Sequence, residues 1–310
     1  MLMNLVRKLR RHVASIPAAV AHHAISVKPI ESRLFASYLK MKCANMQKLP
    51  NLSVIESEIA IGLQQEGVFI TSLAVLGLDG TSEMFAAGLE LSNKNAGIPS
   101  NKGETMNYRP LIKWGVEPTL LRIAEQYLGL PAAYDGPKVT YTPADGRQAG
   151  TRLWHRDRED RRMMKVAIYL NDVTEDGGPL QSVKRHVFEG PLDRDFSHPI
   201  LSDEKLEQRL GRKINPEDIT SCTGPAGTVI FMDTARLFHR GKPAISVDRR
   251  AVFHSYFSRT PRQPFFCERS DLSRIQLMQL ASNLPPEQRE SILWREALPA
   301  YIRLIPKSLI

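Results

Sequence analysis

The run Trp154-His155-Arg156-Asp157 sets an imidazole two residues before a carboxylate. Residues i and i+2 of an extended strand point to the same side, so His155 and Asp157 can both reach one point. The pattern alone is weak evidence. With 8 His and 14 Asp in 310 residues, chance gives about a third of one such pair per chain. Taken by itself, the run 156–162 could equally be a solvated charged turn.

A second histidine, His239, follows the strand-like stretch 227–232, and Arg249 and Arg250 come shortly after it. Two imidazoles and one carboxylate form the ligand set that suits non-haem Fe(II) and leaves coordination positions open. A guanidinium nearby suits a carboxylate-bearing co-substrate, because its planar fork binds a carboxylate through two hydrogen bonds. Together these residues predict iron chemistry with an acidic co-substrate.

The elements that must position these residues change character along the chain. Helical periodicity and caps predict helices over 31–46, 53–65, 81–91 and 118–128, with a short strand at 68–70. Strand-like runs separated by turn signals follow at 138–142, 164–170, 227–232 and 250–257. From 271 to 304 the pattern is helical again. This order predicts an α+β fold, a β-sandwich or barrel with helices packed outside.

Composition excludes several classes of protein. Hydrophobic residues make up 42%, yet no uncharged apolar run approaches the roughly 18 residues of a membrane-spanning helix. Three cysteines without a CxxC pair exclude a disulfide scaffold and a thiolate zinc site, and they favour a reducing compartment, the cytoplasm. The net charge is +9, and five of these charges lie in the acid-free first 30 residues. The remainder is only mildly basic, which argues against nucleic-acid binding.

The N-terminal residues 1–12 resemble a basic amphipathic helix. Three interpretations stay open: contact with an anionic membrane surface, an organelle-targeting peptide, or a solvated helix packed on the body. We therefore expect residues 1–46 to form a basic helical segment and 47–310 to form one domain. The oligomeric state is not readable from the sequence.

Three ordered blocks resemble the phytanoyl-CoA dioxygenase family. They are residues 154–157, the run 170–180 (LNDVTEDGGPL), and 227–231 (GTVIF) leading to His239 and Arg250. The clear resemblance covers about 135–260. It implies a double-stranded β-helix, the jelly-roll or cupin-like core, with flanking helices. It also implies an Fe(II)- and 2-oxoglutarate-dependent dioxygenase that uses O₂ to hydroxylate a small organic molecule, releasing succinate and CO₂.

Carried over residue by residue, the resemblance implies that His155, Asp157 and His239 ligate iron. The family's His-to-Arg gap favours Arg250 over Arg249 for the far carboxylate of 2-oxoglutarate. Lys165, on the less apolar face of the strand 164–170, is a further candidate for that co-substrate; pairing with a nearby acid such as Asp160, or exposure to solvent, is the alternative. The carboxylate of Asp157 favours hydroxylation, or a variant such as desaturation or ring formation, over halogenation, because halogenating relatives have a small residue there.

Other residues receive structural roles. We expect Asp233 to fix the turn before His239, and His254 to be a hydrogen-bonded core residue; His186 and His198 show no ligand pattern. Gly241 stands where many relatives carry a small hydroxyl residue, so one contact to 2-oxoglutarate is missing or comes from elsewhere. A jelly-roll metal-binding protein without oxygenase activity, an isomerase or a sensor, is the alternative function.

Overall fold

The computed structural model describes residues 2–96, 108–188 and 198–308, with side chains from residue 12 onward. Its strands form two antiparallel sheets, a larger one of order β1-β6-β3-β8-β2 and a smaller one of order β5-β4-β7. The strands are β1 (Val68–Ser72), β2 (Ala132–Thr142), β3 (Met164–Tyr169), β4 (Leu180–Val183), β5 (Ile219–Cys222), β6 (Thr228–Met232), β7 (His239–Gly241) and β8 (Arg249–Ser258).

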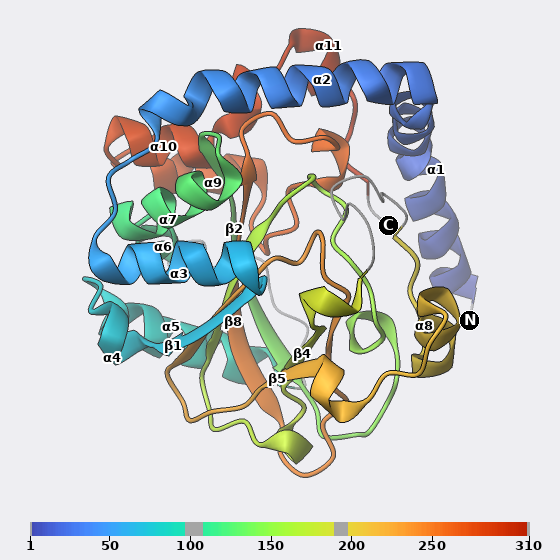
Figure 1. The fold of residues 1–310 in the computed structure, drawn as a ribbon, viewed down its shortest axis with the longest axis vertical. Helices are drawn as coiled ribbons and strands as arrows, with labels where there is room; N and C mark the ends of the chain where they lie inside the picture. Colours follow the sequence, from blue (N-terminus) through green and yellow to red (C-terminus); the bar gives the residue numbers. More distant parts are fainter. Residues whose placement is uncertain (1, 97–107, 189–197, 309–310) are drawn as a thin grey trace.

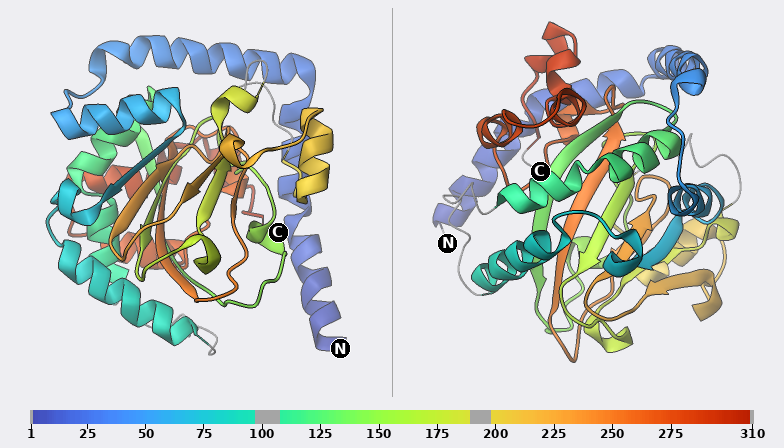
Figure 2. Two further views of the ribbon diagram at one scale, coloured as in Figure 1. Left: turned by 60° about the horizontal axis from the view of Figure 1, so that its bottom comes forward. Right: turned by 90° about the vertical axis from the view of Figure 1, so that its left-hand side faces the viewer.

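Helices gather on the outer face of the larger sheet (Figures 1 and 2). They pack their apolar residues on Val166, Ile168 and Val252, which project from β3 and β8 into the largest core cluster. The helices of this layer are α3 (Val54–Gln65), α5 (Thr81–Asn95), α6 (Arg109–Gly115), α7 (Pro118–Leu128), α9 (Arg274–Ala281) and α10 (Pro286–Ile292). The remaining α-helices are α4 (Leu73–Leu76), α8 (Asp203–Leu210) and α11 (Ala300–Arg303), besides two at the N-terminus.

The inner face of the larger sheet packs against the smaller sheet. Ala167 and Tyr169 of β3 share a buried cluster with Leu180 and Cys222 from the smaller sheet. The hydroxyl of Tyr169 donates to the Cys222 carbonyl at 2.7 Å and accepts the Leu180 N–H at 2.8 Å, so it joins the sheets directly. Two facing antiparallel sheets with helices outside confirm the predicted α+β jelly-roll core.

Two N-terminal helices, α1 (Leu2–Ser26) and α2 (Lys28–Asn45), run along the outside of the body (Figure 1). Glu31 of α2 pairs with the guanidiniums of Arg161 at 2.8 Å and Arg262 at 3.0 Å. Ala18 of α1 packs against Phe265 and Phe266. The N-terminal helix is thus longer than the 12 residues expected, and both helices contact the body. The division at residue 46 stays a prediction.

Most long elements lie where the sequence predicts them. The capping box of Ser53 and Glu56 opens α3, and β8 covers the expected 250–257. The strand predicted at 138–142 is the end of a longer β2, and the short β4, β5 and β7 were not predicted. Strands of three or four residues are too short for periodicity to reveal them. Among the described residues, none of the helices combines the length and apolar character needed to cross a bilayer.

Candidate metal centre

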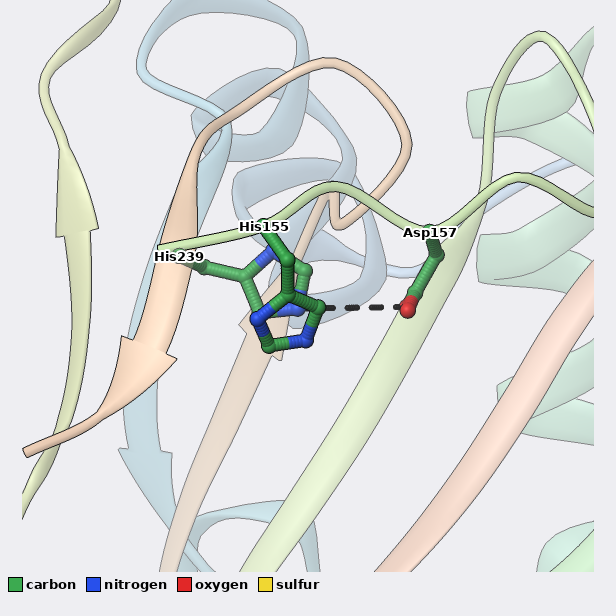
Figure 3. A group of neighbouring side chains, drawn as sticks. All are labelled: His155, Asp157 and His239. Atoms are coloured by element: carbon green, nitrogen blue, oxygen red, sulfur yellow. Dashed lines mark ion pairs between the residues drawn. The ribbon is translucent and has the colours of Figure 1, made fainter. Parts of the chain in front are cut away.

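Three side chains from two separate segments of the chain point toward one another (Figure 3). One possible ligand atom from each of His155, Asp157 and His239 lies within 4.8 Å of the others. The two imidazole centroids are 4.3 Å apart, and Nε2 of His239 is 4.0 Å from Oδ2 of Asp157. The structure therefore brings together the three residues that the sequence singles out. Their role as iron ligands stays a prediction.

Backbone pairing fixes these positions. His155 and His239 form an antiparallel bridge in which each N–H donates to the other's carbonyl, at 3.0 and 2.9 Å. The N–H of Asp157 donates to the carbonyl of Thr234 at 2.8 Å. The segment 155–157 is thus hydrogen-bonded to both ends of the 234–239 loop, which explains why residues about 80 positions apart can share one site.

The protonation of the imidazoles suits metal binding. Nδ1 of His155 lies 2.8 Å from the carbonyl of Leu153, and Nδ1 of His239 lies 3.1 Å from that of Leu237. A carbonyl only accepts, so each Nδ1 carries the proton and each Nε2 keeps its lone pair. Burial lowers the pKa of His155, and burial with the neighbouring imidazole lowers the pKa of His239 to about 3. Both rings are therefore neutral near pH 7.

The carboxylate is held in its charged form. Burial acts to raise the pKa of Asp157, but the ammonium of Lys165 and the two imidazoles outweigh burial and keep that pKa well below its usual range. Nζ of Lys165, from the inner face of β3, is 2.5 Å from Oδ2 of Asp157. Lys165 thus pairs with Asp157 instead of Asp160, whose carboxylate accepts hydrogen bonds from Ser258.

The two arginines at the start of β8 point in opposite directions. Arg249 lies on the inner face with Ala251, and its guanidinium donates to the Gly178 carbonyl and lies 3.4 Å from Oγ1 of Thr142. It also fills the space beside Gly241, because a Cβ at residue 241 would collide with it. Residue 241 lies two positions after His239 in β7, roughly 7 Å along the strand. Arg249 therefore lies inside the barrel near the histidine.

Arg250 is not brought to the three converging side chains. Because successive residues of a strand point to opposite faces, Arg250 projects from the helix-covered face of β8. Its guanidinium lies 5.8 Å from the ring centroid of Tyr141, the residue paired with it on β2. The family's His-to-Arg gap had favoured Arg250. Arg249 instead shares its strand phase with Ala251 and Phe253, which pack on the inner side.

A buried network holds the loop between β6 and β7. Oδ1 of Asp233 accepts the N–H groups of Ala235 at 3.2 Å and Arg236 at 3.3 Å. Its Oδ2 accepts from the Tyr127 hydroxyl and from Nε of Arg236, and Asp233 is fully buried. This is the turn-fixing position expected for Asp233, and Tyr127 of α7 is a member that the sequence did not reveal.

Two further residues bear on the site. Ser182 lies opposite His239 in the β4–β7 register, and its buried Oγ has no hydrogen-bond partner among the described residues. His254 is a core residue as expected: its Nδ1 lies 2.7 Å from the Tyr134 hydroxyl on the helix side of the sheet. Ser182 lies in no recognisable sequence motif, so only the strand pairing shows that it is a neighbour of His239.

No protein-family profile matches the chain. Among curated proteins, the chain is similar to an L-proline trans-4-hydroxylase of Streptomyces griseoviridis, with 27% identity over 171 residues. The match covers 47% of this chain and 62% of that protein, so the chain spans less than two thirds of the relative's length.

Among solved structures, the chain resembles EctD from S. alaskensis, crystallised with 2-oxoglutarate and 5-hydroxyectoine. The TM-score is 0.50 at 17% identity, over 84% of this chain and 89% of the other. At this identity the likeness supports the jelly-roll fold and nothing further.

Proposed function

We propose that the chain is an Fe(II)- and 2-oxoglutarate-dependent dioxygenase that hydroxylates a small organic molecule and releases succinate and CO₂. The observation that carries the proposal is the convergence of His155, Asp157 and His239, whose ligand atoms lie within 4.8 Å of one another. The similarity to an L-proline hydroxylase supports the reaction class. From the motif resemblance we further propose that the chain belongs to the phytanoyl-CoA dioxygenase family.

The donor set fits a ferrous ion. Two neutral imidazoles and one carboxylate on a single face leave the opposite positions open for exogenous ligands. His155, Asp157 and His239 would hold the ion, while the carbonyls of Leu153 and Leu237 orient the two rings. When bound, iron with 2-oxoglutarate supplies oxygen activation for attack on an unactivated C–H bond. The jelly-roll core would position the three side chains around that chemistry.

The inner face of the barrel fits the far carboxylate of 2-oxoglutarate. Here we assign Arg249 the role that the sequence gave to Arg250. Its guanidinium stays charged even where burial lowers the pKa, and its Nε has no partner among the described residues. The unpartnered hydroxyl of Ser182 can supply the contact that Gly241 cannot. A polar ligand on this inner surface would give hydrogen-bond partners to both Nε of Arg249 and Oγ of Ser182, which lack them among the described residues.

Lys165 contributes by orienting Asp157. Its ammonium donates to Oδ2 of Asp157 and balances the charge of that carboxylate. Contact between Lys165 and the co-substrate remains part of the proposal. We also propose that the protein is cytoplasmic, and that residues 1–46 form an N-terminal segment separate from a domain of residues 47–310.

Succinate release tests the function. The protein is incubated in air with Fe(II), 2-oxoglutarate and L-proline, the substrate named for its relative, and then with a small-metabolite extract. We expect succinate release that depends on an added compound and matches formation of a product heavier by one oxygen. Asp157→Ala should abolish both. Metal binding without any consumption of 2-oxoglutarate would instead favour an isomerase or a sensor.

A further inference from the structure

The outer side of α1 exposes a row of apolar side chains. Val13, Ile16 and Val20 are 58%, 55% and 63% exposed. At 3.6 residues per turn, the spacing 13, 16 and 20 puts these three residues within about 60° of one another around the helix axis. The sequence continues the same apolar spacing toward the N-terminus with Leu2, Leu5, Val6 and Leu9. The apolar pattern therefore extends over most of this helix.

The opposite side of α1 packs on the body. Ser15 and Ala18 are 3% and 0% exposed, and they lie about half a turn away from the exposed row. Ala18 and Ile25 belong to an apolar cluster with Phe265 and Phe266. The helix therefore cannot bury the exposed row by rotating, because rotation would expose the residues that now hold it on the body.

Positive charge is concentrated in the two N-terminal helices. Residues 1–46 contain eight Lys and Arg and a single acid, so they supply +7 of the net charge of +9. The acid, Glu31, is turned to the body, where it pairs with two guanidiniums. Arg33 and Lys40 are exposed about half a turn away from Glu31 on α2. The charge that these helices present to solvent is therefore positive.

An apolar row among basic residues fits the surface of an anionic bilayer. Apolar side chains of an interfacial helix insert between headgroups and acyl chains, while Lys and Arg are attracted to anionic headgroups. A nucleic acid would use the positive charge and leave the apolar row exposed. A second copy of the chain would cover the apolar row, but it would bring two strongly positive segments together. The anionic bilayer satisfies both features.

We propose that α1 lies in the plane of a bilayer surface that contains anionic lipids, with Val13, Ile16 and Val20 inserted below the headgroups. This membrane contact is independent of the proposed function. The basic residues need only lie within the Debye length of the headgroups, about 8 Å at physiological salt, so they contribute without fixed contacts. The jelly-roll core would then be held beside the bilayer, outside the hydrocarbon.

Sedimentation with vesicles tests the proposal. The full chain is mixed with vesicles of equal parts phosphatidylglycerol and phosphatidylcholine, or of phosphatidylcholine alone, in about 0.1 M salt. We expect binding to the anionic vesicles at least tenfold tighter than to the neutral ones, and weaker binding in about 0.5 M salt, because salt screens the attraction. The absence of binding to anionic vesicles would overturn the proposal.

Variants locate the contact. Changing Val13, Ile16 and Val20 together to Gln should weaken vesicle binding at least tenfold, since Gln preserves the helix and removes the apolar row. The matched control changes three equally exposed apolar residues on α3, α4 and α9 to Gln, namely Val54, Val75 and Ile275. The control should bind as the wild type does, and circular dichroism should show both variants folded. Equal binding by the two variants would contradict the placement on α1.

The basic residues have a test of their own. Replacement of the four bases of residues 7–11 by Gln should weaken binding to anionic vesicles at least tenfold and leave binding to neutral vesicles unchanged. Sedimentation equilibrium without lipid examines the other occupants. A wild-type dimer that the Val13, Ile16 and Val20 variant converts to monomers would assign this face to a second copy and overturn the proposal. Binding of duplex DNA in place of vesicles would overturn it as well.

Discussion

Each imidazole of the candidate metal site takes its orientation from a backbone carbonyl two residues before it, at Leu153 or Leu237. For the arginines, position in the sequence does not show which side chain faces the barrel interior, because adjacent residues of a strand point to opposite faces. Counting along the chain favours Arg250, whereas the register of β8 turns Arg249 inward. A one-residue shift in phase decides which guanidinium can reach a ligand inside the barrel.

The two arginines therefore give a paired prediction. Arg249→Ala should raise the Kd of 2-oxoglutarate at least tenfold, because it removes the guanidinium that faces the barrel interior. Arg250→Ala should change that Kd less than twofold, since its side chain lies over Tyr141 on the other face. Titration of the charge-transfer band measures both. Equal effects of the two substitutions, or a larger one for Arg250, would refute the reassignment.

For a substitution at Gly241, the structure and the family resemblance predict opposite effects on 2-oxoglutarate binding. Relatives often carry a small hydroxyl residue at this position, so Gly241→Ser could be thought to restore a contact. Here a Cβ at residue 241 would collide with the guanidinium of Arg249. We expect Gly241→Ser to weaken binding of 2-oxoglutarate several-fold. Tighter binding in the serine variant would mean that Arg249 has room to move and is not fixed as described.

Among the elements, the loop from β6 to β7 connects the helix layer to the candidate metal site. Tyr127 of α7 and Asp233 hold its start, Thr234 anchors Asp157, and His239 stands at its end. The long α7 and β8 were predictable because their periodicity extends over ten or more residues. The contact between this loop and α7 was not predictable, since residues 127 and 233 are far apart in the sequence and share no local sequence pattern.

Tyr127→Phe tests this connection. Removing the hydroxyl leaves one buried acceptor position of Asp233 unmet, which should lower the free energy of unfolding by about 1–2 kcal/mol. It should also weaken Fe(II) binding, because the loop that carries Thr234 and His239 is held less firmly. Urea denaturation and a metal titration measure the two effects. Tyr141→Phe, which loses a hydrogen bond to Asp248 just before β8, should leave metal affinity unchanged.

In the whole molecule, ion pairs connect the N-terminal helices to the body of the protein. Glu31 of α2 meets two guanidiniums, Arg161 and Arg262, whose side chains are each 3% exposed. The sequence showed a basic, acid-poor N-terminus and suggested a separate segment. It could not show that the first acid after residue 30 pairs across 130 and 231 positions of sequence, because such pairs form only in the folded chain.

Glu31→Gln should loosen this attachment. Two nearly buried guanidiniums would lose their shared countercharge, which costs about 2–4 kcal/mol for a buried pair. We expect a lower denaturation midpoint and faster proteolysis within residues 12–45. Glu90→Gln, which breaks an exposed pair with Lys94 on α5, is the control and should change stability by less than about 1 kcal/mol. Equal stability of both variants would indicate that the N-terminal helices do not depend on Glu31.

Anaerobic absorption spectroscopy tests the central claim most directly. Fe(II) and 2-oxoglutarate, added together and not singly, should give a weak visible charge-transfer band in the wild-type protein. Asp157→Ala and His239→Ala should each abolish it while the fold remains intact by circular dichroism. A band of unchanged intensity in both variants would mean that iron binds elsewhere, and the site built from these side chains would be wrong.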